Sequence, residues 1–339
     1  MHINITPELS ICITSYNRAN ELLRCLKSID CKFPEKIEVI ISEDCSPQRK
    51  SIVEKVNQYK VDAPYDVHLN LNEFNLGYDG NLARLISLAS GKYVLLMSDD
   101  DLFISGAIDK TMAFLERHEC GILFSPFQIG IELKRKYGKS ARIEPNIKNA
   151  AEHIYDAILF SGLIFKRDYV KNISGDRFAK LNYFQVFLFL SVLSRYVGYY
   201  LDVPLIDCIG DGENAYGIAE SNDKNPYLAD RKSIFSNLEF HKGLIKVIQL
   251  FESDNNVPVV PIFSKEYSLR SYSGLSLARR KGRKEYREYW KRLNSLELQL
   301  SFIVYIYYSI LYLVGADLSD TIFYIPKKFI YLIRGNKCL

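Results

Sequence analysis

Hydrophobic residues in the first 125 positions alternate between two spacings. Short apolar runs predict strands, and apolar residues three and four positions apart predict the helices between them. The expected strands are 10–14, 37–42, 67–71, 93–97 and 121–125, and the expected helices begin near residues 20, 52, 82 and 105, with Asn20 and Ser105 as caps. The run Tyr93–Met97 has no polar face, which is typical of a strand inside a parallel sheet. This order predicts an α/β fold with an open, doubly wound, mostly parallel sheet.

Polar residues follow three of these strands at the points where the strands end. They form the segments Thr14–Asn17, Glu43–Ser46 and Ser98–Asp101. The carboxyl ends of parallel strands meet at one edge of an open sheet, and ligands of such folds bind there. One polar cluster alone is equally well explained as a surface turn. Three at equivalent places predict a shared ligand crevice.

The segment Asp99–Asp101 places three carboxylates side by side after an apolar strand. Like charges at this spacing repel one another, and burying them without partners is costly. Either the segment faces water as an ordinary turn, or a cation binds there.

The composition favours a globular intracellular protein and gives no indication of a nucleic-acid-binding or a secreted one. With 339 residues, 48% hydrophobic and 25% charged, the chain is globular and long enough for a large domain with an appendage. A formal net charge of +4 is too small to indicate nucleic acid binding by itself. The seven cysteines form no C-x-x-C pair, and the N-terminus lacks the pattern of a signal peptide, so a reduced, cytoplasmic chain is expected.

The alternation fades from about residue 126 onward. The remaining expected elements are strands at 160–165 and 199–209, an apolar helix at 186–193, a mobile glycine-rich loop at 210–217, and helices beyond about 230. We therefore expect a domain over residues 1–230, with halves 1–130 and 131–230, followed by a helical region over 231–339.

Three stretches of the chain resemble a known enzyme family. They read SICITSYNRANELLRCLKSI, VIISEDCSPQ and NEFNLGYDGNLARLISLASGKYVLLMSDDDL. In this order they resemble the nucleotide-sugar-binding half of bacterial family 2 glycosyltransferases with the GT-A fold, closely over residues 8–130 and loosely over 155–215. The N-x-G-x-D-x-N spacing that begins at Asn75 is most similar to the abequosyltransferase-like branch. The resemblance implies transfer of a hexose or deoxyhexose from a nucleotide sugar to a lipid-linked glycan in O-antigen or capsule synthesis.

The resemblance also implies a divalent metal, Mg²⁺ or Mn²⁺, at the acidic segment. The family's Asp-x-Asp signature falls on Ser98-Asp99-Asp100, with serine in place of the first aspartate. By this match Asp100 is the expected metal ligand, and Asp99 lies near the ribose and the metal. Asp101 is an adjoining metal-site acid or, alternatively, a residue at the start of a helix. Arg18 is expected to be a solvated surface arginine rather than a phosphate ligand.

The residues expected to bind the nucleotide sugar come from all three loops. By the family match they are Thr14, Tyr16, Asn17, Glu43, Asp44, Asn75, Gly77, Asn81, Ser98 and Asp99. Tyr16 and Thr14 are expected at the base, and Asp44 is expected to accept a hydrogen bond from the base or ribose. Gly77 permits a tight turn. For Asn81, bracing of the loop and direct contact with the nucleotide are equally expected.

One departure from the family pattern concerns the catalytic base. Inverting members carry a Glu-Asp pair before the apolar helix, and its aspartate removes the acceptor's proton. Here the corresponding stretch is Asn182–Gln185, which has no carboxylate. Asp176 is the nearest substitute, with a loop or capping role as the alternative. A retaining reaction would also explain the difference, so the stereochemistry stays open.

The C-terminal region bears on where the protein works. A basic stretch at Arg279–Arg292 is followed by Leu298–Ala316, which contains no charged residue, and by a second apolar segment at Tyr324–Arg334. A helix in the membrane interface, a spanning helix and a core helix are all open. The tyrosines and the polar Asp317–Asp320 hinge favour interfacial attachment, with the basic stretch meeting anionic lipids. We expect a peripheral or monotopic protein at the cytoplasmic face of the cell membrane.

Two other functions compete with this enzyme. The missing Glu-Asp pair favours a catalytically degenerate nucleotide-sugar-binding or scaffold protein, whereas the acidic segment opposes it. The basic stretch Arg279–Arg292 with its tyrosines and tryptophan is also compatible with nucleic acid. The adjacent apolar run favours a membrane surface, so no nucleic acid partner is expected.

Overall fold

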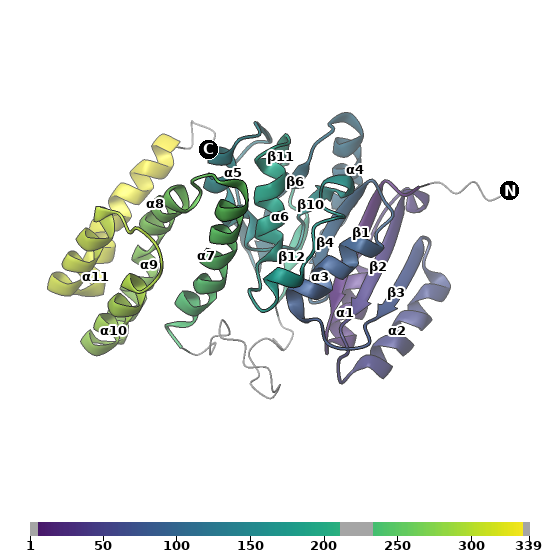
Figure 1. Ribbon diagram of the computed structural model, residues 1–339, viewed down its shortest axis with the longest axis horizontal. Coiled ribbons are helices and arrows are strands. Elements are labelled where there is room, and N and C mark those ends of the chain that lie inside the picture. The colour runs from purple at the N-terminus through teal and green to yellow at the C-terminus, as the bar shows by residue number, and fades with distance from the viewer. Residues whose placement is uncertain (1–5, 211–232, 335–339) are drawn as a thin grey trace. The chain divides into compact units, whose positions relative to one another are not determined.

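The computed structural model of the chain describes residues 6–210 and 233–334 (Figure 1). The chain divides into two compact units, residues 1–215 and 216–339. The domain boundary expected at residue 230 and almost all of the expected glycine-rich loop lie outside the described residues.

The first unit is built on an eight-stranded sheet in the order β3-β2-β1-β4-β10-β6-β11-β9. Its strands are β1 (Leu9–Ser15), β2 (Ile37–Glu43), β3 (Asp66–Leu71), β4 (Tyr93–Ser98), β6 (Ile122–Phe124), β9 (Ala141–Ile143), β10 (Ile164–Lys166) and β11 (Gly198–Tyr200). β1 pairs in parallel with β2 and β4, and β2 pairs in parallel with β3, as the alternating pattern predicted. β10 and β9 run antiparallel to their neighbours, so the complete sheet is mixed.

A smaller sheet of four strands has the order β5-β12-β7-β8. Its strands are β5 (Asp101–Phe103), β7 (Phe127–Ile129), β8 (Glu132–Lys134) and β12 (Ile206–Cys208). The α-helices of the first unit are α1 (Ala19–Lys27), α2 (Arg49–Asp62), α3 (Gly77–Leu88), α4 (Ala107–Arg117), α5 (Ile147–Glu152) and α6 (Phe184–Leu193). The single strand expected at 199–209 is therefore wrong. That segment forms β11 and β12, which belong to different sheets.

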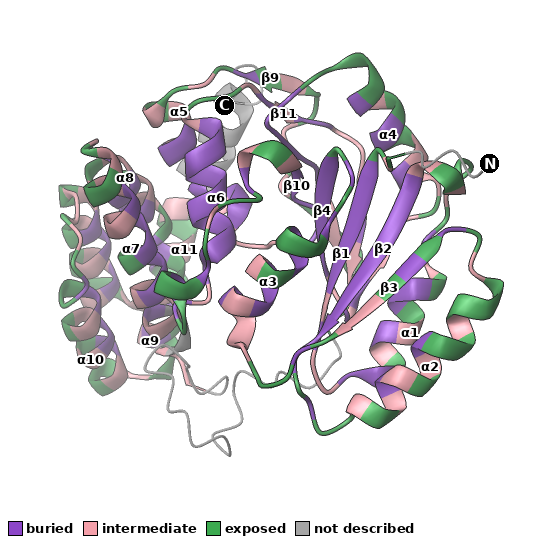
Figure 2. Cartoon of the chain, turned by 45° about the vertical axis from the view of Figure 1, so that its right-hand side comes forward, coloured by how far each residue is buried: buried purple, intermediate pink, exposed green. Residues whose placement is uncertain are grey.

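Helices cover both faces of the parallel part of the main sheet (Figure 2). Ile11 and Ile13 of β1 belong to the hydrophobic cluster that contains Leu22 of α1. Cys12, between them, points to the opposite face, where its thiol contacts the Leu85 carbonyl of α3. Because both faces of β1 are covered by helices, the polar side chains that follow the end of this strand are the ones that can contact a ligand.

Two expected helix caps are wrong by one or two residues. The N-cap of α1 is Arg18, because the chain turns at Asn17 with a φ of 58°, so Asn20 lies inside the helix. The N-cap of α4 is Gly106, with a φ of 67°, instead of Ser105. Neither N-cap residue makes a side-chain capping hydrogen bond.

The described part of the second unit is helical, as expected. It consists of α7 (Ser236–Asn255), α8 (Val260–Arg270), α9 (Tyr272–Lys281), α10 (Arg283–Asn294) and α11 (Phe302–Arg334). α11 is interrupted at Gly315, whose φ of 84° and ψ of 176° are not helical.

Candidate active site

The ends of β1, β2 and β4 lie at the same level in the main sheet. Thr14 of β1 is in register with Ser42 of β2 and with Ser98 of β4. The three polar segments that follow these strands therefore start at one edge of the sheet. The prediction that they converge is confirmed by backbone contacts as well, since the Asp44 amide donates to the Ser15 carbonyl at 3.0 Å.

Asp99 is buried between the loops that follow β1 and β4. Its side chain accepts hydrogen bonds from the Tyr16 amide at 3.1 Å and from Nη1 of Arg18 at 2.9 Å. Burial raises the pKa of Asp99 to about 7, and the charge of Arg18 partly opposes that rise. Asp99 thus joins the two loops, while its proposed contact with the ribose stays a prediction.

Asp100 is more accessible than Asp99, with 14% of its side chain exposed. Its Oδ2 lies 2.9 Å from Nη1 of Arg18, and its Oδ1 accepts a hydrogen bond from the Ser98 hydroxyl. The expectation that Arg18 is a solvated surface residue is therefore wrong: its side chain is 10% exposed and bridges both carboxylates. The positive φ of Asn17 directs the chain so that Arg18 faces the end of β4.

Asp101 has a different environment from Asp100, although the two are adjacent in sequence. It is the first residue of β5, and its carboxylate accepts a hydrogen bond of 2.5 Å from the Ser161 hydroxyl. Burial raises the pKa of Asp101 to about 6. The expected helix start is not observed here. Ser161 occupies one oxygen of Asp101, and a metal-binding role for this residue stays a prediction.

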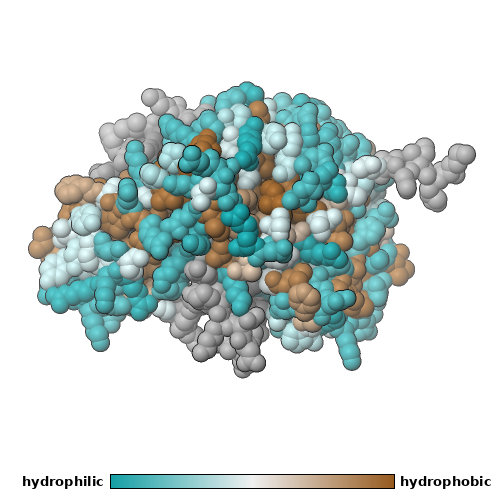
Figure 3. Space-filling view, viewed as in Figure 1, coloured by the Kyte–Doolittle hydropathy of each residue, from teal (hydrophilic) through white to brown (hydrophobic). Residues whose placement is uncertain are grey.

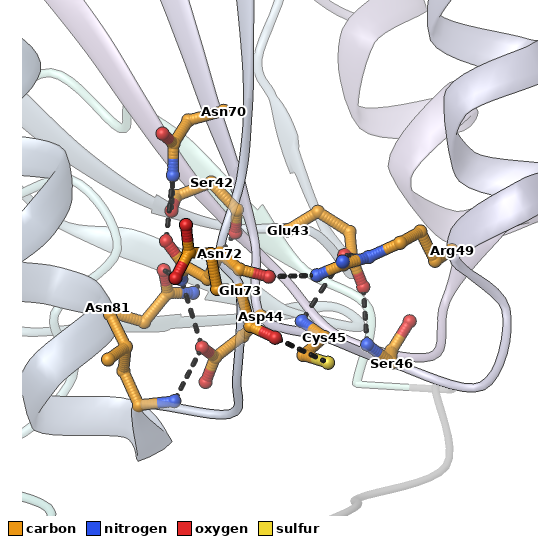
Figure 4. Close-up of polar contacts among 11 residues, drawn as sticks. Ser42, Glu43, Asp44, Cys45, Ser46, Arg49, Asn70, Asn72, Glu73 and Asn81 are labelled. Atoms are coloured by element: carbon orange, nitrogen blue, oxygen red, sulfur yellow. Dashed lines mark hydrogen bonds and ion pairs between the residues drawn. The ribbon is translucent and has the colours of Figure 1, made fainter.

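Glu43 holds the turn that follows β2 (Figure 4). Its carboxylate accepts hydrogen bonds from the amides of Cys45 at 3.2 Å and Ser46 at 2.6 Å. It also forms an ion pair with Nε of Arg49. Because the Glu43 side chain is fully buried, its observed role is to hold this turn, and direct contact with a nucleotide stays a prediction.

Asp44 is fixed by the loop that precedes α3. Its Oδ1 accepts hydrogen bonds from Nδ2 of Asn72 at 2.9 Å and from the Leu76 amide at 2.8 Å. Burial raises the pKa of this carboxyl. Asn81 braces the same loop, because its Oδ1 accepts from Asn72 at 3.0 Å and its Nδ2 donates to the Ser42 carbonyl at 3.0 Å (Figure 4).

The loop before α3 turns sharply at Gly77. The Gly77 amide donates to Oδ1 of Asn75 at 2.8 Å, and Gly77 has a φ of +74°, which a residue with a Cβ rarely adopts. The prediction that Gly77 permits a tight turn here is confirmed. Asn75 is exposed, and Thr14, Tyr16 and Asn17 are half-buried, so all four are accessible for the predicted ligand contacts.

Asp79 is a buried acid whose function the sequence analysis missed. It lies in the first turn of α3, is 1% exposed, and accepts hydrogen bonds from the amides of Asn182 at 2.8 Å and Phe184 at 2.9 Å. Burial raises its pKa to about 6. Asp79 therefore caps the start of α6, beside the stretch that lacks the family's Glu-Asp pair. A single acid among the apolar positions of α3 was the available signal.

Other residues of the segment 131–210 connect to the same loops. Gln185 of α6 accepts from the Tyr78 hydroxyl at 3.0 Å and donates to the Ile158 carbonyl at 3.0 Å. Ser161, which was also missed, accepts from the Ser98 amide at 3.1 Å in addition to holding Asp101. No sequence signal marks it, because its partners are distant along the chain.

Asp176 lies at the start of a short 3₁₀ helix, Asp176–Phe178, and is exposed. Its Oδ2 accepts a hydrogen bond of 2.9 Å from the Ser174 hydroxyl. The adjacent Gly175 packs closely on α3, where an added Cβ would come within 2.6 Å of Ala83. Asp176 is therefore near the first turns of α3, and its catalytic role stays a prediction.

Comparison with known proteins bears on this arrangement. Residues 10–173 match the family model described as Glycosyl transferase family 2. Abequosyltransferase RfbV of Salmonella typhimurium is 25% identical over 227 residues, which cover 61% of this chain and 68% of that protein. GalNAc(5)-diNAcBac-PP-undecaprenol beta-1,3-glucosyltransferase of Campylobacter jejuni is 35% identical over 107 residues, so the match spans 31% of this chain but only 34% of that protein.

Among solved structures, S. aureus TarS in complex with UDP-GlcNAc is 18% identical to this chain, with a TM-score of 0.56. The match covers 85% of this chain and 81% of the TarS chain. At this identity the likeness shows the fold. The matching family model, the relatives and the shared fold agree with the arrangement of the three strand ends: residues 10–173 form a family 2 glycosyltransferase region, and the chain has the GT-A fold.

Proposed function

We propose that this protein transfers a hexose or deoxyhexose from a nucleotide sugar to a lipid-linked glycan during O-antigen or capsule synthesis. The observation that carries the proposal is that β1, β2 and β4 end at one edge of the sheet, where Arg18 bridges Asp99 and Asp100, inside the region that matches the family. The name of one relative, a glucosyltransferase with an undecaprenol-linked substrate, supports the acceptor class, and the name of another, an abequosyltransferase, supports transfer of a deoxyhexose. A related fold bound to UDP-GlcNAc supports the donor class.

The nucleoside part of the donor would bind between the loops after β1 and β2. Tyr16 and Thr14 are half-buried there, and their ring and hydroxyl can meet the base. Asp44 is held in place by Asn72 and Leu76, so its carboxylate would already be oriented to accept a hydrogen bond from the base or ribose. Preorganisation of this kind lowers the entropic cost of binding.

The residues after β4 fit a divalent cation through Asp100. Mg²⁺ is usually held by one or two carboxylates together with substrate phosphates and water. Within residues 6–210 and 233–334 no group of three or more His, Cys, Asp or Glu side chains is placed to hold a metal, so phosphates would have to complete the ligand set. Asp100 would hold Mg²⁺ or Mn²⁺ with the diphosphate, while Asp101 supports the loop through Ser161. The ion would neutralise charge on the departing diphosphate.

The acceptor's proton has two candidate destinations. Asp176 is exposed and near α3, so it can serve as the base of an inverting reaction. If the reaction is retaining, the departing phosphate takes the proton. Asp79 is a poor base here, because backbone amides at the start of α6 occupy its carboxylate.

We also propose that the second unit attaches to the membrane interface. By length and hydropathy, Phe302–Phe323 of α11 could span a membrane. Its first part, however, ends at the non-helical Gly315, which leaves a helix shorter than the roughly 20 residues that spanning requires. Val304, Tyr307 and Leu311 are buried on one face of the helix. Phe302, Tyr305 and Leu313 are exposed on the other side of this first part, and Leu318 and Ile322 are exposed beyond Gly315.

The exposed apolar face of α11 lies next to a row of cations on α10. Arg283, Arg287 and Lys291 are four residues apart and exposed, so they share one side of the helix. The Arg287 guanidinium donates to the Tyr312 hydroxyl at 3.2 Å, which joins this row to α11. Hydrophobic side chains also come to the surface where α11 lies (Figure 3). Aromatic and apolar groups bordered by cations fit an anionic lipid surface at the cytoplasmic face.

The donor-binding proposal is tested by screening nucleotide sugars for Mn²⁺-dependent hydrolysis and thermal stabilisation. We expect one base and sugar to stand out in both measurements. Stabilisation without hydrolysis or transfer to any lipid-linked acceptor would favour the catalytically degenerate scaffold instead.

The membrane proposal is tested by sedimentation with anionic and with neutral vesicles. The triple charge reversal of Arg283, Arg287 and Lys291 to Glu should lower binding to anionic vesicles at least about tenfold. A matched control reverses the exposed Lys50, Lys60 and Lys110 of the first unit and should bind like the wild type. Equal binding by all three proteins would overturn the interfacial assignment.

A further inference from the structure

Arg18 bridges the two carboxylates that follow β4. Its Nη1 lies 2.9 Å from Oδ1 of Asp99 and 2.9 Å from Oδ2 of Asp100. The remaining oxygen of Asp100 accepts a hydrogen bond from the Ser98 hydroxyl. Both oxygens of the expected metal ligand therefore already have a partner, and one of these partners is a cation.

The position of Arg18 is built into the fold. The turn at Asn17 places Arg18 at the N-cap of α1, and the neighbouring Tyr16 amide binds the same Asp99 carboxylate. Asp99 thus has a second donor that does not depend on Arg18, whereas the charge of Asp100 is neutralised by a long side chain. Arg18 can leave Asp100 and still stay bonded to Asp99.

We propose that Arg18 is an exchangeable counter-ion for Asp100. In the donor-free protein its guanidinium neutralises the acidic pair. When a divalent cation binds Asp100 together with a nucleoside diphosphate, Arg18 keeps its hydrogen bond to Asp99. It gives up its contact with Asp100 and donates to a phosphate oxygen instead. The inference rests on the proposed function, because it requires a nucleotide donor.

Electrostatics give this exchange a direction. A guanidinium is always charged and has five N–H groups that suit phosphate oxygens. A metal ion bound at Asp100 without nucleotide would lie close to this fixed positive charge, and the repulsion weakens metal binding. A diphosphate brings negative charge beside both cations. Arg18 therefore opposes the metal alone and favours the metal together with the nucleotide, which couples their binding.

The test compares the wild type with Arg18→Gln and with Arg49→Gln. Arg49 is a matched control, because its guanidinium bonds the buried Glu43 and the Asn72 carbonyl at the same edge of the sheet instead of Asp100. Mn²⁺ binding is measured by the loss of the free-ion electron paramagnetic resonance signal without nucleotide. Binding of UDP, GDP, CDP and dTDP is then measured by calorimetry with Mn²⁺, and thermal melting checks that each variant is folded.

We expect Arg18→Gln to bind Mn²⁺ at least about tenfold more tightly than the wild type without nucleotide. In the presence of Mn²⁺ it should bind the preferred nucleotide at least about tenfold more weakly. Arg49→Gln should change neither constant by more than about twofold. Opposite changes in the two constants are not expected if Arg18 only braces the loop, because a looser loop weakens both.

Unchanged or weaker Mn²⁺ binding by Arg18→Gln, with normal nucleotide binding by the wild type, overturns the inference and leaves the proposed function standing. No nucleotide binding by the wild type overturns both. If Arg18→Gln does not fold, Arg18→Lys takes its place. Lysine keeps the charge but lacks the forked donors, so Mn²⁺ binding should match the wild type while nucleotide binding weakens. Tighter Mn²⁺ binding by Arg18→Lys would contradict the proposal.

Discussion

The strands β2 and β4 both end in acidic residues at the same edge of the sheet, but the acids are neutralised differently. Glu43 after β2 is fully buried and accepts hydrogen bonds from the amides of Cys45 and Ser46, besides its ion pair with Arg49. Asp100 after β4 is partly exposed, and its carboxylate is bonded by the side chains of Arg18 and Ser98. Backbone amides of a folded turn cannot leave a carboxylate, whereas a guanidinium on a flexible side chain can.

We infer from this difference that the acid after β2 stabilises the fold and that the acid after β4 binds the ligand. The Glu43 carboxylate in the turn after β2 has hydrogen-bond and ion-pair partners without a ligand. The loop after β4 is balanced by Arg18, which a metal ion and a diphosphate can replace at Asp100. Substitutions after β2 should therefore change stability first, and substitutions after β4 should change binding and turnover first.

The largest effect is expected for Asp100→Asn. Asparagine keeps the size of the side chain and an oxygen for Ser98, but it removes the charge that would hold the metal. Transfer and donor hydrolysis should fall at least about a hundredfold, with loss of Mn²⁺-dependent nucleotide binding. The melting temperature should change by only a few degrees. Full activity of Asp100→Asn in metal-free buffer would contradict the assignment of Asp100 as the metal ligand.

Glu43→Ala should act in the opposite way. It leaves the amides of Cys45 and Ser46 and the Arg49 guanidinium without their buried acceptor. We expect the free energy of unfolding to fall by about 3 kcal/mol in urea titrations. If Glu43→Ala keeps its stability and instead loses nucleotide binding, the comparison between the two strand ends is wrong.

Asp79 is another buried acid, and backbone amides at the start of α6 donate hydrogen bonds to its carboxylate. Burial raises its pKa from 3.8 to about 6, so the folded protein binds this proton more tightly than the unfolded chain does. The associated stability is therefore present below about pH 4 and is lost as the pH rises through about 6, by roughly 3 kcal/mol. Asp79→Asn should flatten this part of the stability profile. An unchanged profile would mean that Asp79 ionises without a penalty.

The smallest effect is expected for Asp44→Asn. Asparagine can still accept from Asn72 and Leu76, so the loop should keep its shape. Loss of the charge should weaken nucleoside binding by about fivefold and leave pyrophosphate binding unchanged, as calorimetry with each ligand would show. Equal losses for both ligands would indicate that Asp44 only supports the loop.

The sequence was sufficient to predict the parallel half of the sheet and the convergence of the three polar segments. Apolar runs with helical segments between them specify β1, β2 and β4, and parallel pairing brings their ends to one edge. The antiparallel β10 and the separate β11 and β12 were not predicted correctly. Each has three residues, too few to show a period, and their partners are distant along the chain.

Side-chain partners were harder to predict than strand ends. The burial of Arg18 depends on the positive φ at Asn17, which gives the side chain a direction that no spacing rule contains. Asp79 and Ser161 bind groups roughly 60 to 100 residues away, so their roles appear only when the chain is folded. In each case the residue type was visible in the sequence and its partner was not.

The most direct test of this account is a crystal structure of the protein with Mn²⁺ and the nucleotide that the screen selects. The cation should lie on Asp100, with Nη1 of Arg18 still on Asp99 and another of its N–H groups on a phosphate oxygen. The Glu43–Arg49 pair should be unchanged. A nucleotide bound away from these three strand ends, or an intact Arg18–Asp100 contact with the cation held elsewhere, would contradict the account.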